Sequence, residues 1–242
     1  MKNSLIILAA MLALPFAALR AQTEDEQETV EFQPNDQYSI SARKISASEY
    51  YARKNESEHL RHKPYKVITD SQEAQKRLGR KIKLIEVQEW ENIKYFDTEI
   101  TFKDGTKRRV DRTFAIGFRA YFPELNILLY EGEALGDYMI DLNDSRSIDM
   151  HTTGNPYNHA VSPDKQLRIN GYYIGGASEG SEYWLEKWNP KKKQYEFVRD
   201  FEGDVFYLSR NWFWTSNSTA LFQYGWWEKS AEFYEMEIII NN

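Results

Sequence analysis

The chain contains no cysteine and only four histidines among its 242 residues. Without cysteine it can form no disulfide, no thiolate nucleophile and no cysteine-linked lipid anchor. No serine stands in a Gly-x-Ser-x-Gly motif, and the glycine-rich run at 174–180 lacks the Lys-Ser or Lys-Thr of a phosphate-binding loop. The segment 141–152 begins like a calcium loop but lacks the glycine at its sixth position and the glutamate at its twelfth. The sequence therefore predicts no metal site and no cofactor.

Long apolar runs are also missing, apart from residues 5–19 near the amino terminus. This run is shorter than the roughly 18–20 residues that span a bilayer as a helix. Lys2 precedes it, and Leu19-Arg20-Ala21 places a small residue at a cleavage point. We expect a signal peptide over 1–21, with the alternative of an uncleaved membrane anchor because Arg20 stands beside the cut. The product would be exported to the periplasm or the medium and would not span the membrane.

The charge is acidic overall but unevenly distributed. The chain carries a net charge of −6, which argues against non-specific nucleic-acid binding. Residues 43–83 hold twelve Lys or Arg against five Asp or Glu, a net charge of +7. This basic segment either lies against the acidic body of its own domain or docks on an anionic partner. Residues 22–37 are poor in apolar side chains, which indicates a disordered acidic linker.

Helix signals are confined to the amino-terminal part of the chain. The pattern at 46–60 predicts a short helix that begins near Ser46 or Ser48. A second helix would be capped by Asp70 and closed by Gly79. Together with a strand from 80 to 87 and a hairpin over 93–112 that turns at Asp104-Gly105, these elements form a basic helical segment plus β-hairpin over 38–113.

From residue 114 to 242 every segment alternates as strands do. Turn sequences begin near positions 123, 162 and 215, so the pattern recurs every 40–53 residues. This spacing is typical of a four-stranded propeller blade. We expect residues 114–242 to be a blade-like antiparallel region and residues 38–242 to form one domain.

The second round, Ala160-Val161-Ser162-Pro163-Asp164-Lys165-Gln166-Leu167, resembles the repeat of TolB-like and WD40-like β-propellers, with Lys165 in the place of the usual glycine. In this turn Pro163 presets a backbone angle and Asp164 can bond its own backbone. The resemblance implies a mainly β fold: a propeller-like array of about three four-stranded antiparallel blades with a short helical amino-terminal segment. Three rounds are fewer than the four to eight blades of a closed ring. The hairpin at 93–112 would supply part of a fourth, and a β-sandwich is the alternative fold.

Aromatic residues make up 15% of the chain. Strand alternation places Trp184 and Trp188 on one face, and it places Trp212 and Trp214 on one face. Such rings either fill a core or form a platform for a sugar, a peptide or another flat ligand. The core is favoured for Trp212 and Trp214. The ligand-binding candidates are Trp226, Trp227, Tyr172, Trp184 and Trp188.

Two histidines suggest a different function. His151 and His159 flank a Gly-Asn-Pro loop, with Asp149 and Asp164 close in sequence. This cluster is either a general base with its orienting carboxylate or loop hydrogen bonding. The sequence thus predicts an exported, non-catalytic binding or protein-interaction module of the cell envelope, with an unknown protein or glycan as partner. The alternative is an extracytoplasmic, glycan-acting hydrolase that uses a carboxylate pair near His151 and His159. A third hypothesis is an envelope assembly protein that docks through residues 43–83.

Overall fold

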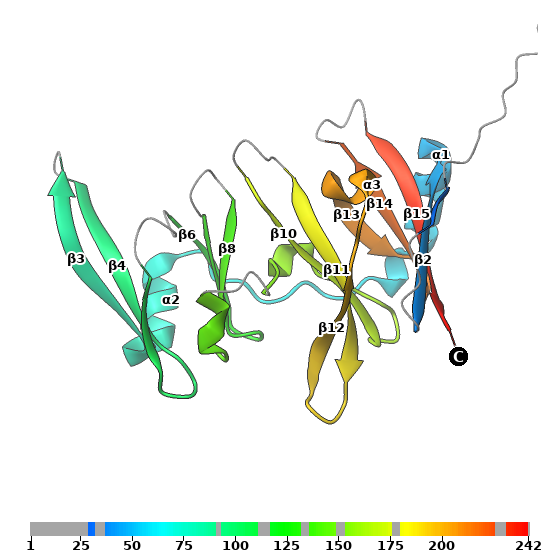
Figure 1. The fold of residues 1–242 in the computed structure, drawn as a ribbon. Coiled ribbons are helices and arrows are strands. Elements are labelled where there is room, and N and C mark those ends of the chain that lie inside the picture. Colours follow the sequence, from blue (N-terminus) through cyan, green and yellow to red (C-terminus); the bar gives the residue numbers. More distant parts are fainter. Residues whose placement is uncertain are drawn as a thin grey trace, which may run out of the picture.

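The computed structural model describes residues 29–31, 37–90, 93–110, 117–131, 136–148, 153–175, 180–225 and 231–241, and it describes side chains in these ranges except at 29–31 and 84–97. The expected signal peptide over 1–21 lies outside the described residues, as does most of the expected linker over 22–37. The described chain is mainly β and forms four antiparallel sheets with no closed barrel among them (Figure 1).

The sheets follow one another along the chain. The first contains β3 (Ile82–Trp90), β4 (Ile93–Thr101) and β5 (Lys107–Val110). The second contains β6 (Gly117–Phe122), β7 (Ile127–Glu131) and β8 (Asp137–Asp141). The third has the order β12-β11-β10-β9, from β9 (Ala160–Val161), β10 (Leu167–Tyr173), β11 (Ser181–Asn189) and β12 (Gln194–Asp200). The fourth has the order β1-β2-β15-β14-β13, from β1 (Thr29–Glu31), β2 (Tyr38–Ile45), β13 (Ser209–Trp214), β14 (Thr219–Tyr224) and β15 (Glu232–Ile240).

The expectation of about three four-stranded units was wrong in number. The sheets have three, three, four and five strands. The predicted turns near 123, 162 and 215 are confirmed, because each joins two paired antiparallel strands: β6 and β7, β9 and β10, and β13 and β14. The hairpin over 93–112 is confirmed as β4 and β5, and β3 adds a strand to it.

The fourth sheet joins the two ends of the described chain. β2 pairs with β15 along its whole length, from Tyr38 opposite Ile240 to Ile45 opposite Phe233. β2 alternates between buried and more exposed side chains, the pattern of a strand with one face in a core. Sequence reasoning assigned no strand to these residues.

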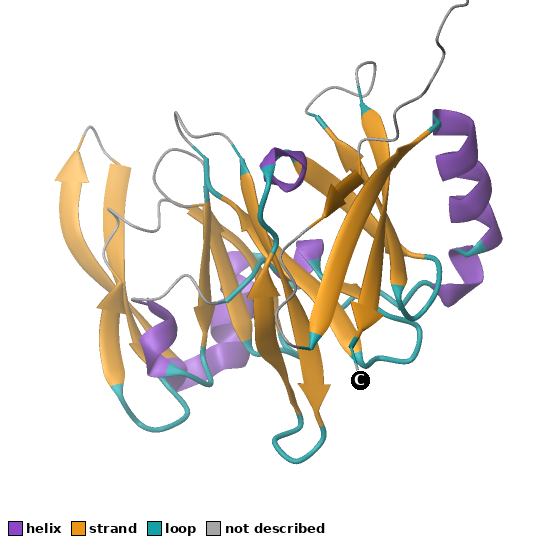
Figure 2. Ribbon diagram, turned by 45° about the vertical axis from the view of Figure 1, so that its right-hand side comes forward, coloured by secondary structure: helices purple, strands orange, loops and turns teal. Residues whose placement is uncertain are grey.

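One helix lies outside the sheets, at the right of Figure 2. Helix α1 (Ala47–Glu56) begins after Ser46, whose hydroxyl accepts a hydrogen bond from the Glu49 N–H, and it is followed by a 3-10 turn at Glu58–Leu60. Its Tyr50 is fully buried in a small cluster with Ile45, Leu221 and Phe233, so α1 covers the outer face of the fourth sheet. The predicted helix over 46–60 is therefore confirmed.

The second predicted helix is also confirmed. Helix α2 (Ser71–Leu78) is capped by Asp70, whose carboxylate accepts from the Glu73 N–H at 2.7 Å. It ends at Gly79, whose φ of 56° is a left-handed conformation that favours glycine. Three further short 3-10 turns and one short helix complete the described elements: Gly79–Lys81, Ser145–Ile148, Pro156–Asn158 and α3 (Asp204–Tyr207).

Buried side chains fill the space between successive sheets. Ile100 packs with Leu128 and Ile140 between the first and second sheets, where α2 contributes Leu78. Phe122 and Trp184 pack between the second and third sheets. The largest cluster lies between the third and fourth sheets and includes these fully buried residues: Ile169, Leu185, Phe206, Ala220, Phe222 and Met236. Each fully buried large side chain stabilises the fold by roughly 1.5–3 kcal/mol, so the sheets are held face to face.

The basic segment 43–83 spreads over several parts of the molecule. Arg43 and Arg53 both pair with Glu235 on β15, and Lys44 pairs with Glu232. These contacts fit the expectation that the segment lies against the acidic body of its own domain. Residues 61–70 then run as an extended chain from the α1 end of the molecule to α2 (Figure 1), and Ile68 bridges to Tyr121 on β6. Of the helices in the described ranges, none has the length and apolar character needed to cross a bilayer.

Candidate ligand-binding cavity

A cavity of about 600 Å³ lies beside the strands β9 and β13. These two edge strands are neighbours, and the Trp214 indole N–H donates to the Ala160 carbonyl at 2.9 Å between them. The extended segment 60–67 and the turn at Pro156–Asn158 complete the wall. The volume is within the range of 300–1,000 Å³ that is usual for small-molecule sites. We call this space the central cavity.

The walls of the central cavity are basic and aromatic. Four cationic side chains line it, and they come from three parts of the chain: Arg61, Lys63, Lys165 and Arg210. Eight of its lining residues carry large aromatic rings, among them Tyr65, Tyr157, Tyr195 and Trp212. No Asp or Glu is among the described residues that line it, although the whole chain has a net charge of −6. The cavity is therefore a basic site on an acidic protein.

Arg210 is held at the wall by an irregular piece of β13. The pairing with β14 shifts register between Arg210 and Phe213, and Asn211 adopts a φ of 55° inside this bulge. Nε and Nη2 of Arg210 are enclosed, and neither makes a hydrogen bond. Among the described residues no carboxylate forms an ion pair with this guanidinium. An enclosed and unpaired charged group costs free energy, because it has lost water without gaining a partner.

His159 is the second unsatisfied group. Both of its ring nitrogens are enclosed and make no hydrogen bond of normal geometry. Its neighbour Asn170 is engaged elsewhere, since its amide donates to Glu186 and its carbonyl accepts from the Gly171 N–H. Burial, followed by the positive charge of Arg168, holds the pKa of His159 well below 6.5. The imidazole is therefore neutral at neutral pH, and its ring lies edge-on to Tyr65 at 5.6 Å between centroids.

The turn that carries the propeller resemblance forms one edge of the central cavity. Ser162 and Asp164 organise it: the Ser162 hydroxyl donates to Asp164 and accepts from the Leu167 N–H. Lys165 occupies a left-handed position in this turn, with a φ of 63°. Nε2 of His62 lies 2.9 Å from the Ser162 carbonyl oxygen, which ties the segment 60–67 to this turn.

The arrangement does not supply the catalytic cluster that was considered from the sequence. Asp164 is bound within its own turn, and no carboxylate of the described residues contacts His159. A hydrolase of the expected kind needs two carboxylates about 5–9.5 Å apart, and the described cavity lining contains none. His151 and Asp149 lie outside the described residues.

Two of the predicted ligand-binding residues lie in the core. Tyr172 and Trp184 are 8% and 5% exposed and pack between the second and third sheets. The Tyr172 hydroxyl donates to Glu182, and burial raises its pKa well above 10. The Trp184 indole donates to Glu186 at 2.9 Å. Neither residue lines the central cavity.

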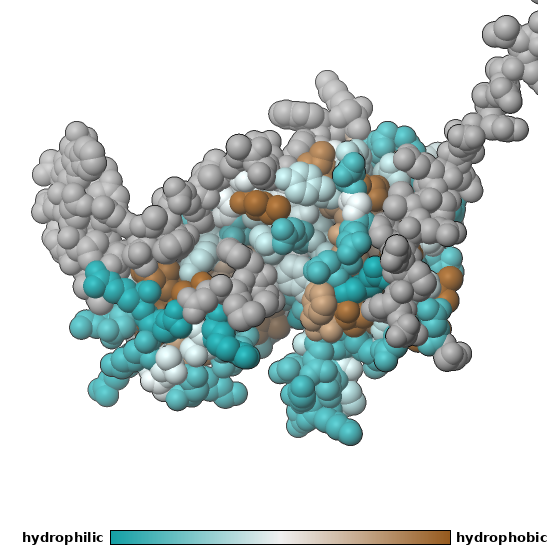
Figure 3. Space-filling view, viewed as in Figure 1, coloured by the Kyte–Doolittle hydropathy of each residue, from teal (hydrophilic) through white to brown (hydrophobic). Residues whose placement is uncertain are grey.

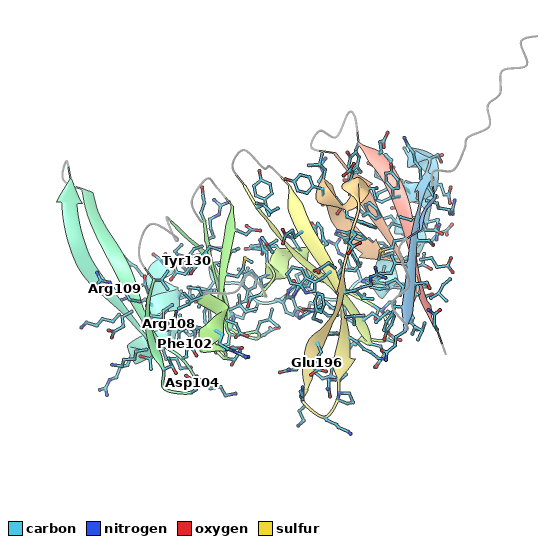
Figure 4. All side chains as sticks on the ribbon, in the orientation of Figure 1. Phe102, Asp104, Arg108, Arg109, Tyr130 and Glu196 are labelled. Atoms are coloured by element: carbon cyan, nitrogen blue, oxygen red, sulfur yellow. The ribbon has the colours of Figure 1, made fainter. Side chains whose placement is uncertain are left out.

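The other predicted residues lie elsewhere or outside the description. Trp188 contacts the Tyr195 ring and lines a separate hollow near the β11–β12 hairpin, with Tyr38 and Phe197. This hairpin projects from the molecule and its surface is hydrophilic (Figure 3). Glu196 marks it in Figure 4. Trp226 and Trp227 lie outside the described residues. Of the rings assigned to the core, Trp214 is buried and Trp212 packs against the same cluster.

Sequence reasoning missed Arg210 and Tyr65. The signal that pointed toward the site was the basic composition of residues 43–83, which supplies Arg61 and Lys63 to the cavity wall. Nothing in the local pattern around Arg210 distinguishes it from a surface arginine on a strand. Within the described ranges no cluster of three or more His, Asp or Glu is arranged to hold a metal ion. Comparison of the chain with protein-family models, with curated proteins and with solved structures finds no match.

Proposed function

We propose that the protein is an exported, non-catalytic binding module that takes a small ligand into its central cavity. The observation that carries the proposal is the unsatisfied lining of this cavity. Arg210 and His159 have enclosed nitrogen atoms that make no hydrogen bond of normal geometry with the described residues, and native proteins satisfy nearly all such groups. A ligand that accepts hydrogen bonds would satisfy them, whereas a purely structural role leaves their cost unexplained.

The architecture supports the same proposal. Four sheets packed face to face suit an open, propeller-like array, in which one edge strand of a sheet borders a central space. β9 and β13 are edge strands of the third and fourth sheets, and the central cavity lies beside both. Concave sites between rigid sheets are the usual places for small ligands.

Export from the cytoplasm is the second part of the proposal, and it depends on residues 1–21. Expression of the full chain with a carboxy-terminal tag, followed by amino-terminal sequencing of the exported product, tests it. We expect the mature chain to begin at Gln22. A product that stays in the membrane fraction and retains Lys2 would contradict cleavage.

Binding in the cavity is tested by screening a library of small polar compounds against the purified protein by thermal shift and ligand-observed NMR. A cavity-filling variant, Val67→Trp, places a large ring on an exposed residue of the wall. The matched control is Ile239→Trp, an exposed position on β15 that does not line the cavity. We expect binding to the original protein and to Ile239→Trp but not to Val67→Trp. Hits that bind Val67→Trp unchanged, or no hits at all, would overturn the proposed function.

A further inference from the structure

We propose that the ligand of the central cavity is a small ring compound that carries a carboxylate. This inference rests on the proposed function of the cavity as a binding site and adds the chemical class of what it holds. The chain offers two independent observations for it: an unpaired guanidinium in a wall free of acids, and several rings around the same space.

The guanidinium of Arg210 is suited to bind an anion with two acceptor oxygens. Nε and Nη2 of Arg210 lie on one edge of the fork, and both are enclosed without a hydrogen bond. A planar carboxylate matches this edge with two parallel hydrogen bonds, which a single hydroxyl cannot do. Arg168, another partly buried arginine, has a carboxylate partner in Glu186. The charge of Arg210 on the cavity wall is thus available to pair with a ligand.

The surroundings favour negative charge over neutral ligands. Arg61, Lys63 and Lys165 line the same cavity, and no described acid of the wall offsets them. His159 stays neutral because its ring is buried and the positive charge of Arg168 opposes protonation, so it offers one hydrogen-bond donor and one acceptor. An anion entering this field is stabilised by several charges at once, and the effect weakens as salt rises.

The remaining walls suit a ring. Tyr65 and Tyr195 line the cavity together with Trp212, whose indole N–H faces the Tyr183 hydroxyl but makes no hydrogen bond of normal geometry. Aromatic side chains stack on flat or apolar ring faces. Asn158 adds an amide for a hydroxyl group of the ligand. Carboxylated rings occur as sugar acids and as aromatic acids, and the two sources differ in their hydroxyl groups.

Four probes in two matched pairs test the inference by isothermal titration calorimetry. Glucuronate is compared with glucose, and benzoate is compared with benzyl alcohol, so that each pair differs mainly in the carboxylate. We expect at least one acid to bind at least tenfold more tightly than its neutral partner. The pair that shows the preference identifies the source of the ring.

Variants assign the preference to Arg210. Arg210→Gln should reduce the affinity for the acid at least tenfold and remove its advantage over the neutral probe. Arg109→Gln is the matched control: it removes the same charge from an exposed site on β5, far from the cavity (Figure 4). Arg210→Lys should retain part of the preference, because the charge remains while the fork is lost.

The possible outcomes separate this inference from the proposed function. Neutral and acidic probes that bind equally well would overturn the carboxylate and leave the cavity as a binding site. Acid binding that Arg210→Gln leaves intact would overturn the role of Arg210. All four probes could fail while compounds from the library screen bind the original protein but not Val67→Trp. That result would overturn the ligand class alone. Failure of both experiments would overturn the proposed function as well.

Discussion

The space between the second and third sheets and the central cavity both hold polar side chains, but the hydrogen bonding of these side chains differs. Between the sheets, Glu186 accepts hydrogen bonds from Trp184 and Asn170 and pairs with Arg168. In the central cavity the enclosed nitrogens of Arg210 and His159 make no such hydrogen bonds with the part of the chain that the structure describes. The first region is a closed network, in which the polar side chains form hydrogen bonds and ion pairs with one another. The second is incomplete without another molecule, which is why we place the function there.

Asp137 extends the closed network to the second sheet. Its carboxylate accepts from the Asn155 amide at 2.8 Å and from the Tyr173 N–H at 2.9 Å. Burial raises its pKa, and these hydrogen bonds oppose the rise. Gly154 lies against Asn170 so closely that a Cβ would meet the amide oxygen. The network is therefore fitted around a backbone position that requires glycine.

The largest expected effect comes from breaking the closed network. Glu186→Ala removes one acceptor from three buried donors, so the free energy of unfolding should fall by about 3 kcal/mol. Urea denaturation measures it. The control is Glu196→Ala, which removes an exposed ion pair with Lys192 on the projecting hairpin (Figure 4) and should cost less than about 1 kcal/mol. Equal losses in the two variants would show that the buried network contributes no more to stability than an exposed ion pair does.

The next effect depends on pH and comes from the cavity. The folded protein holds the pKa of His159 below 6.5, so below pH 6.5 the unfolded chain binds a proton that the folded protein does not. The unfolding free energy should therefore fall on acidification below pH 6.5, by up to about 1.4 kcal/mol per pH unit from this group, until the lower folded pKa is reached. Denaturation of His159→Gln between pH 7 and 5 should show a smaller decline. Identical declines would mean that the ring is protonated inside the folded protein.

A smaller effect is expected at the turn on the cavity edge. Lys165 holds a φ of 63°, a conformation that costs a side chain roughly 1–2 kcal/mol. Lys165→Gly should raise the unfolding free energy by about 0.5–1 kcal/mol, because glycine relieves this strain but adds freedom to the unfolded chain. Asn126→Gly is the control, at a φ of 61° in the turn between β6 and β7. Since asparagine tolerates this conformation, its gain should be smaller; a loss at Lys165→Gly would place the lysine side chain in a stabilising contact.

The smallest effect separates the two regions most directly. Arg210→Gln should raise the unfolding free energy slightly, by less than about 0.5 kcal/mol, because an enclosed charge that has no ion-pair partner among the described residues is replaced by a neutral polar group. The same thermal or chemical denaturation used for Glu186→Ala measures it. A loss above about 1.5 kcal/mol would show that Arg210 is held by the protein itself, and the cavity would then resemble the closed network.

Local signals in the sequence predicted local structure well. The carboxylate of Asp70 and the hydroxyl of Ser46 each satisfy a backbone N–H three residues later, so these caps are visible in the sequence. The turn at Asp104-Gly105 is equally local, since Gly105 takes a φ of 87° and Asp104 accepts from the Thr106 N–H. Asp104 marks the tip of that hairpin in Figure 4. These features depend on neighbours within a few residues.

The candidate site could not be predicted in the same way. Trp184 and Tyr172 were expected at a binding surface, but packing against Phe122 and Met139 of the second sheet buries them. Strand alternation showed that Trp184 has a definite face, yet it could not show what covers that face. Arg210 became a candidate only through its lack of a partner, which is a property of the folded surroundings.

The sequence by itself determined the helix caps, the hairpin turns, the mainly β class and the basic segment, because each follows from composition or from contacts between near neighbours. Tertiary structure decided that β2 pairs with β15 across about 190 residues of chain and that a basic segment meets β9 and β13. It also decided that Arg210 has no counter-ion among the described residues. These depend on which faces pack together. Such packing is a cooperative balance of burial and hydrogen bonding over the whole chain, and no short stretch of sequence specifies it.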